Sequence, residues 1–113
     1  MGGLNSADGG YFDIVIGNPP YVSVKKISIE DKLIFSKTYK TAVGQFDLYG
    51  LFIEKSIDFL KLKGVLSFIT SNTFLNNKDF STLREYLLNN TNIHTIVNLD
   101  ESIFETAQVD VAI

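Results

Sequence analysis

Blocks of apolar residues alternate along this chain with segments of helical periodicity. The apolar residues within 12–16, followed by Gly17, are typical of a strand buried on both faces of a parallel sheet. A second strand of this kind is expected over residues 65–69, and a third over residues 93–99. Residues 109–113 begin a fourth strand that the end of the sequence cuts short. The pattern therefore predicts a sheet of buried strands.

A strong helix is expected between the first two strands. From Phe46 to Leu60, apolar residues recur three or four positions apart. Gly64 is expected to end this helix, with lysines close to its negative C-terminal pole. Polar residues occupy the opposite face, and they are Asp47, Glu54, Asp58 and Lys61. Such a helix packs one face on the sheet.

Two weaker helical segments complete the pattern. A short helix is expected at residues 30–36, within a polar and lysine-containing stretch. Asp79 is placed to cap another helix, whose apolar face consists of Phe80, Leu83 and Leu87. The resulting order of strand, helix, strand, helix and strand predicts parallel strands in an open α/β sheet with right-handed crossovers.

The carboxyl ends of the strands are the expected place for a functional site, because ligands bind there in open α/β sheets. Three loops leave those ends, and they cover residues 18–21, 71–74 and 100–104. We therefore expect these loops, far apart in the sequence, to meet at one edge of the sheet.

The composition fits one domain or a piece of a larger one. The chain has 113 residues, of which 45% are hydrophobic and 20% are charged, so several domains are excluded and the composition argues against wholesale disorder. It contains no cysteine, which removes disulfides and zinc–thiolate sites, and no metal site is expected. No apolar run reaches membrane-spanning length, and residues 1–10 are interpreted as a flexible leader, native or added. A cytoplasmic protein is expected.

Positive charge is concentrated in one segment. The whole chain carries a net charge of −3, which argues against a stand-alone nucleic-acid binder with a basic surface. Residues 22–45 nevertheless contain five lysines and two acidic residues, which give a local charge of +3. The simplest interpretation of such a run is a solvated surface.

Asn18, Pro19, Pro20 and Tyr21 form the one segment that folding alone does not explain. Two prolines in series hold the backbone extended and offer no donors, so the Asn18 side chain and the Pro19 carbonyl are fixed relative to each other. Two rigid oxygen acceptors beside an aromatic ring suit an exocyclic amino group on a flat heterocycle such as adenine. Acceptance of both amino hydrogens localises the nitrogen lone pair toward an incoming methyl group, without a proton-abstracting base.

The sequence does not point to a general base for such a reaction. The single histidine, His94, falls inside the third expected strand, where a structural role is the ordinary one. Catalysis by positioning and electrostatics is consistent with this composition.

The sequence around this motif resembles the catalytic motif of DNA adenine-N6 methyltransferases, in the run Phe12-Asp13-Ile14-Val15-Ile16-Gly17-Asn18-Pro19-Pro20-Tyr21-Val22. The run Asp47-Leu48-Tyr49-Gly50-Leu51-Phe52 resembles their next motif. The spacing onward to Phe104 is similar to that in the large methylases of type IIG restriction-modification systems, and the similarity covers residues 11–113. Ribosomal RNA adenine and protein glutamine methyltransferases share the first motif, whereas the Asp-Leu-Tyr helix at this distance favours the DNA group.

The resemblance implies a role for each motif residue. Asn18 and Pro19, in the rigid context completed by Pro20, hold the target amino group, and Tyr21 stacks on one face of an adenine flipped out of the duplex. Phe104 either closes on the other face or anchors the core. Phe52 either lies near the adenine of S-adenosylmethionine, the cofactor of this family, or simply packs.

The resemblance also implies parts that residues 11–113 do not supply. In this family a cofactor-binding half precedes the Asn-Pro-Pro-Tyr strand, and a separate domain recognises the DNA sequence. We therefore expect residues 11–113 to be the catalytic-motif half of a partial Rossmann-like methyltransferase domain, inactive alone. Exposed apolar surface at Ile14 and Ile16, with self-association through the open edge of the first strand, is expected as well. A fragment of an RNA adenine or protein glutamine methyltransferase, or a non-enzymatic binding fragment, is the alternative.

Overall fold

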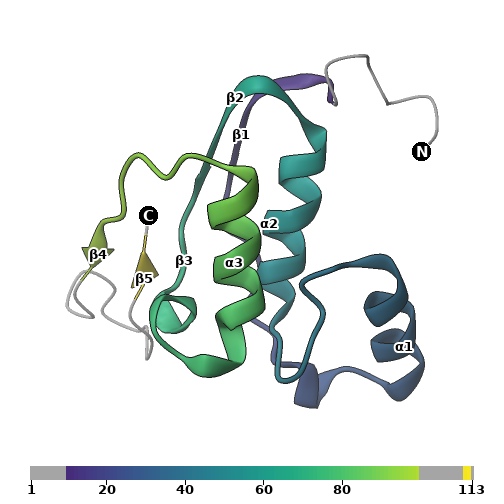
Figure 1. Cartoon of the computed structure of the whole chain (residues 1–113). Helices are drawn as coiled ribbons and strands as arrows, with labels where there is room; N and C mark the ends of the chain where they lie inside the picture. Colours follow the sequence, from purple (N-terminus) through teal and green to yellow (C-terminus); the bar gives the residue numbers. More distant parts are fainter. Residues whose placement is uncertain (1–9, 100–110, 113) are drawn as a thin grey trace.

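A computed structural model describes residues 10–99 and 111–112 of the chain (Figure 1). Its elements are, in order, β1 (Phe12–Gly17), the 3₁₀ turn η2 (Val24–Lys26), α1 (Ile29–Thr38), α2 (Leu48–Phe59), β2 (Leu60–Phe68), β3 (Thr70–Ser71), the 3₁₀ turns η3 (Asn72–Leu75) and η4 (Lys78–Phe80), α3 (Ser81–Asn90), β4 (Asn98–Leu99) and β5 (Val111–Ala112). The predicted α/β class is confirmed. No helix among the described residues is long and apolar enough to cross a membrane.

β1 and β2 form a parallel pair, as the sequence predicts. Ile14 lies opposite Val65, and Gly17 lies opposite Phe68. The crossover between the two strands contains α2, and Figure 1 shows α2 and α3 side by side in front of the strands. Because the strands are parallel, the loop after β1 and the residues after β2 lie at the same end of the pair.

The boundary between α2 and β2 lies earlier than the sequence indicates. α2 ends at Phe59 rather than at Gly64, and Leu60 already belongs to β2. Leu60 pairs with Phe12 of β1, directly after the last residue of the helix, and the regular pairing of the two strands resumes at Val65. The turn lies inside β2, where the register to β1 shifts and Lys63 has a positive φ of 67°. Lys61 and Lys63 are thus strand residues that follow the end of α2, and neither belongs to the last turn of the helix.

The short strands form a second sheet and do not extend the first. β5 lies antiparallel between β3 and β4, so the single parallel sheet expected from the sequence is wrong for the described residues. Of the third expected strand, residues 93–99, only Asn98 and Leu99 are in a strand, because these two residues pair with β5. His94 lies outside this strand, with an exposed side chain.

α3 begins later than its predicted cap. The helix starts at Ser81, and Phe80 occupies the N-cap position without a side-chain hydrogen bond. Asp79 lies in η4, where its backbone N–H donates to Asn77 Oδ1 at 2.9 Å. The prediction that Asp79 caps the helix is wrong, because η4 extends to Phe80 and places Asp79 one residue before the N-cap position.

The best-buried side chains gather around α2. Tyr49 is 0% exposed, and Ile53 of the same helix is also buried. Glu54, expected on the solvent-facing side, is buried as well, because its carboxylate accepts hydrogen bonds from Lys40 N at 3.1 Å and Thr41 N at 2.8 Å. Glu54 thereby attaches the segment that carries α1, the predicted short helix, to the side of α2.

The outer surface of β1 is exposed. Ile14 is 61% exposed and Ile16 is 77% exposed, which confirms the exposed apolar surface expected at these residues. Among the described strands, β1 has β2 as its one neighbour. Self-association through the other edge of β1 stays a prediction.

Leu83 and Leu88 form a matched pair on α3. Leu83 is 3% exposed and packs over Gly50, where a Cβ atom would lie 3.3 Å from Leu83 Cδ2, whereas Leu88 is 69% exposed. We expect Leu83→Ala to lower the free energy of unfolding by about 2–5 kcal/mol because it opens a cavity between the helices. Leu88→Ala should change it by less than about 0.5 kcal/mol. Chemical denaturation of both variants measures this difference, and equal losses would contradict the packing of α3 on α2.

Candidate functional site

The loop after β1, called here the 18–21 loop, consists of Asn18, Pro19, Pro20 and Tyr21. Pro19 is buried, whereas the other three residues are exposed. The Asn18 side chain makes no hydrogen bond to a described residue. Pro19 therefore anchors the loop, and no described residue uses the acceptor or the donor group of the Asn18 amide.

Tyr21 contacts two other parts of the chain. Its ring centroid lies 5.9 Å from that of Tyr49 at an interplanar angle of 76°, and its hydroxyl donates to the Ile69 carbonyl at 3.4 Å. The residue is still 37% exposed. Burial, followed by the charge of Asp47, raises the pKa of the Tyr21 hydroxyl, which is therefore neutral at physiological pH. A neutral ring with a fixed orientation and an open side can stack on a flat heterocycle.

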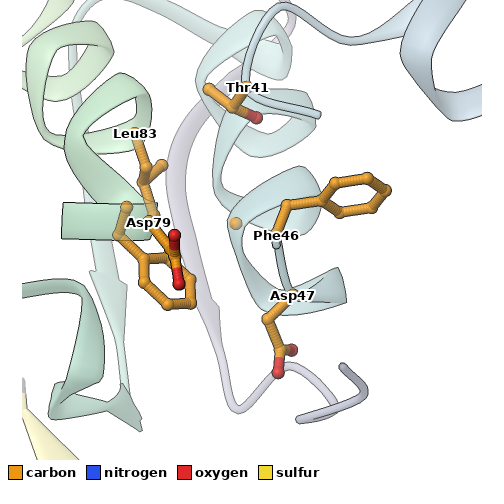
Figure 2. A pocket seen from close by; sticks show the side chains of 7 residues that line it. Thr41, Phe46, Asp47, Asp79 and Leu83 are labelled. Carbon is orange, nitrogen blue, oxygen red and sulfur yellow. The ribbon is translucent and has the colours of Figure 1, made fainter. Parts of the chain in front are cut away.

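Asp47 ties this loop to α2. Its Oδ1 atom accepts hydrogen bonds from Val22 N at 2.8 Å and from Tyr49 N at 3.2 Å. Leu48 N donates to the Val22 carbonyl at 3.0 Å, beside an antiparallel bridge between Ser23 and Asp47. Figure 2 shows the carboxylate at the start of α2, directed toward the chain that follows β1. One oxygen atom thus caps the helix and fixes the first residue after the loop.

Tyr49 connects the 18–21 loop to the residues that follow β2. Its hydroxyl lies 2.9 Å from Thr73 Oγ1, and its ring centroid lies 6.3 Å from that of Phe74 and 5.6 Å from that of Phe80. Burial raises the pKa of the Tyr49 hydroxyl, although the hydrogen bond with Thr73 acts in the opposite direction. Of the three loops expected to meet, those at residues 18–21 and 71–74 both contact Tyr49, whereas the third loop, residues 100–104, lies outside the described residues.

Phe52 and Phe104 are the two other aromatic residues with expected roles. Phe52 lies on α2 and is 46% exposed, so its ring is not enclosed in the core of the described residues. Phe104 lies outside the described residues. The Phe52 ring offers an apolar face that suits the flat base of a nucleoside.

A small cavity lies between α2 and α3. Its volume of about 10 Å³ has room for about one water molecule. Seven residues line it, as Figure 2 shows, and they are Thr41, Phe46, Asp47, Gly50, Asp79, Phe80 and Leu83. An adenine ring does not fit in this space, so the exposed 18–21 loop is the better candidate for binding a base.

Asp47 and Tyr49 are site residues whose contacts the sequence pattern did not reveal. The sequence pattern assigns Asp47 to the polar face of a helix, whereas the structure places it at the N-cap. An aspartate directly before an apolar-periodic segment is a typical N-cap signal, so this position was detectable. The contact between Tyr49 and Thr73 joins residues 24 positions apart and has no local signal.

Several known proteins match this chain. The sequence profile described as Eco57I restriction-modification methylase matches residues 4–104. The chain is 42% identical over 83 residues to the type II methyltransferase M.TthHB8I of Thermus thermophilus, a match that covers 67% of this chain and 19% of that protein. It is 38% identical over 93 residues to the type II methyltransferase M.BstVI of Geobacillus stearothermophilus, covering 80% of this chain and 16% of that protein. It is also 34% identical over 90 residues to the type II restriction enzyme and methyltransferase RM.Eco57I of Escherichia coli, covering 77% of this chain and 9% of that protein. The chain thus spans less than a fifth of the length of these relatives.

Substitutions of Asp47 separate its helix cap from its hydrogen bond to Val22. Asp47→Asn keeps an acceptor for both amides, Asp47→Ser keeps a cap but is too short for Val22, and Asp47→Ala loses both. Loss of the cap should cost about 1 kcal/mol of stability, and the unpaired Val22 N–H should cost about 1–3 kcal/mol more. Stability should therefore fall in the order Asn, Ser, Ala in chemical denaturation. Slow hydrogen exchange at the Val22 amide in the Ala variant would contradict the assigned contact.

Proposed function

This chain belongs to the Eco57I restriction-modification methylase family, and from that premise we propose that it is the part of a DNA methyltransferase that holds the target base. The observation that carries the proposal is the 18–21 loop. It combines an exposed Asn18 amide and a partly exposed Tyr21 ring on a backbone held by buried Pro19 and by the Asp47 carboxylate. Such a loop recognises a flat ring that bears an amino group.

The proposed target is the N6 amino group of adenine. Asn18 Oδ1 and the Pro19 carbonyl oxygen accept the two hydrogens of N6. This arrangement turns the nitrogen lone pair out of conjugation and toward the methyl donor. The chain contributes position and electrostatics, and no general base is needed before transfer because the lone pair of the amino nitrogen attacks the methyl group directly. The methylated nitrogen then releases its surplus proton to water.

The target adenine reaches this loop by leaving the duplex, because its amino group is not accessible to the enzyme inside the stacked helix. Tyr21 stacks on one face of the flipped base, and stacking offsets part of the cost of extrusion. Phe104 is proposed to close on the other face.

The proposed cofactor, S-adenosylmethionine, supplies the methyl group when bound. Among the described residues, the 46% exposed Phe52 ring fits the adenine moiety of this cofactor by stacking. The groups that hold the ribose and the methionine end are proposed to belong to a cofactor-binding half of the same protein, outside residues 11–113. We therefore assign the activity to the full-length protein, together with a domain that recognises the DNA sequence.

Asn18→Ala in the full-length protein tests the assigned acceptor. Loss of one of the two N6 acceptors should slow DNA methylation by about 10²–10³-fold, as removal of a single stabilising hydrogen-bonding group does elsewhere. DNA affinity should be nearly unchanged, because it comes mainly from phosphate contacts. Mass spectrometry of digested DNA measures N6-methyladenine, and Asn89→Ala, an exposed asparagine on α3, is the matched control.

Retention of about a tenth of the wild-type rate by the Asn18 variant would refute this role. Methylation by the wild-type protein of RNA adenine or of protein glutamine, with DNA left unmodified, would instead support a different substrate for the same loop.

Tyr21 variants test stacking. Tyr21→Ala should destabilise the flipped base by about 1–3 kcal/mol, whereas Tyr21→Phe should be nearly silent because the ring remains. The hydroxyl contributes little, since its bond to the Ile69 carbonyl is long at 3.4 Å. A fluorescent adenine analogue at the target position reports flipping, and a Phe variant as damaging as Ala would show that the hydroxyl matters more than stacking.

A further inference from the structure

Residues 22–45, called here the lysine segment, form a small unit fixed to α2. Four buried residues make its core with α2, and they are Val24, Ala42, Phe46 and Leu51. At one end of the segment, Val24 N donates to the Phe46 carbonyl at 3.0 Å. At the other end, Glu54 accepts hydrogen bonds from Lys40 N and Thr41 N. These contacts hold the backbone that carries the lysines against α2 and the residue before it.

Positive charge in this segment is not neutralised within the described part of the chain. The segment carries +3, whereas the whole chain carries −3. None of its five lysines forms an ion pair with a described residue. By contrast, Lys61 in β2 lies 4.0 Å from the Asp13 carboxylate, and Lys55 in α2 lies over the Phe59 ring. The unpaired charge is therefore available to an external anion.

The excess positive charge of the lysine segment is located at η2 rather than on α1. α1 contains Glu30 and Asp31 together with two lysines, so its charges balance. Lys25 and Lys26 in η2 are exposed and adjacent, with no acidic residue in that turn. This pair of charges is the most basic point of the segment.

η2 begins two residues after the 18–21 loop, since only Val22 and Ser23 lie between them. Lys25 lies four positions after Tyr21, so their Cα atoms are at most about 14 Å apart. Duplex DNA carries about one phosphate charge per 1.7 Å of its axis. When a base is held by the 18–21 loop, phosphates of the adjoining nucleotides therefore come within reach of these lysines.

We propose that Lys25 and Lys26 bind DNA phosphates next to the flipped nucleotide. This inference rests on the proposed function for the identity of the ligand and adds the surface that holds its backbone. Phosphate contacts fix the position of a duplex without reading its sequence. The lysine pair thus holds the strand while the 18–21 loop holds the base.

The salt dependence of DNA binding tests this contact. Full-length Lys25→Ala/Lys26→Ala protein is titrated with a labelled duplex of mixed sequence by fluorescence anisotropy at several salt concentrations. Two lost phosphate contacts should reduce the slope of log K against log salt by about 1.8. Lys61→Ala/Lys63→Ala, which removes two charges from β2, is the matched control and should leave the slope unchanged. Lys25→Gln/Lys26→Gln keeps long polar side chains and should behave like the Ala pair.

An unchanged slope in a Lys25/Lys26 variant that keeps the wild-type melting temperature would overturn the proposal. An equal loss of affinity in the Lys61→Ala/Lys63→Ala control would also overturn it. If the Ala pair does not fold, the Gln pair decides by the same slope. The measurement is independent of methyl transfer. Wild-type protein that binds duplex DNA but forms no N6-methyladenine would refute the proposed function and leave the phosphate contact to be judged by the slope alone.

Discussion

The Asp47 carboxylate is the contact on which the geometry of the site depends. Its Oδ1 atom receives the Val22 amide, which follows the 18–21 loop, and the Tyr49 amide in the first turn of α2. The capped helix then places the Tyr49 ring against Tyr21 and its hydroxyl against Thr73. Three segments that are distant in the sequence are therefore positioned from a single side chain. Removal of that carboxylate would free the loop and the helix start together.

Elements with strong local patterns were predictable, and elements decided by pairing were not. β1 and the parallel partner β2 follow from their apolar runs, and α2 follows from its periodicity. The end of α2 at Phe59 was missed because strand pairing with β1 begins at Leu60, before the glycine expected to end the helix. The exposure expected for Glu54 was wrong because hydrogen bonds from two backbone amides offset the cost of burying its carboxylate. Neither the strand pairing nor these hydrogen bonds can be recognised from the residues next to them in the sequence.

In the candidate site, too, features with a local sequence pattern were predictable, and features that depend on distant contacts were not. Asn18 and Tyr21 could be singled out because the prolines between them restrict the backbone wherever the loop lies. Their surroundings depend on contacts across the fold, such as the ring of Tyr49, and no spacing rule identifies such a contact. The roles proposed for Asn18, Tyr21, Phe52 and Phe104 stay predictions, and the last of these residues lies outside the described part of the chain.

The lysine segment leaves the body of the protein and returns to it at neighbouring backbone groups, since Ser23 and Asp47 form one bridge. The hydrogen bonds of this bridge set the distance between the two ends of the segment. The number of residues between the ends does not. The entropy of closing such a loop rises only slowly with its length. Insertions or deletions around α1 can therefore accumulate during evolution while the 18–21 loop and α2 keep their relative placement.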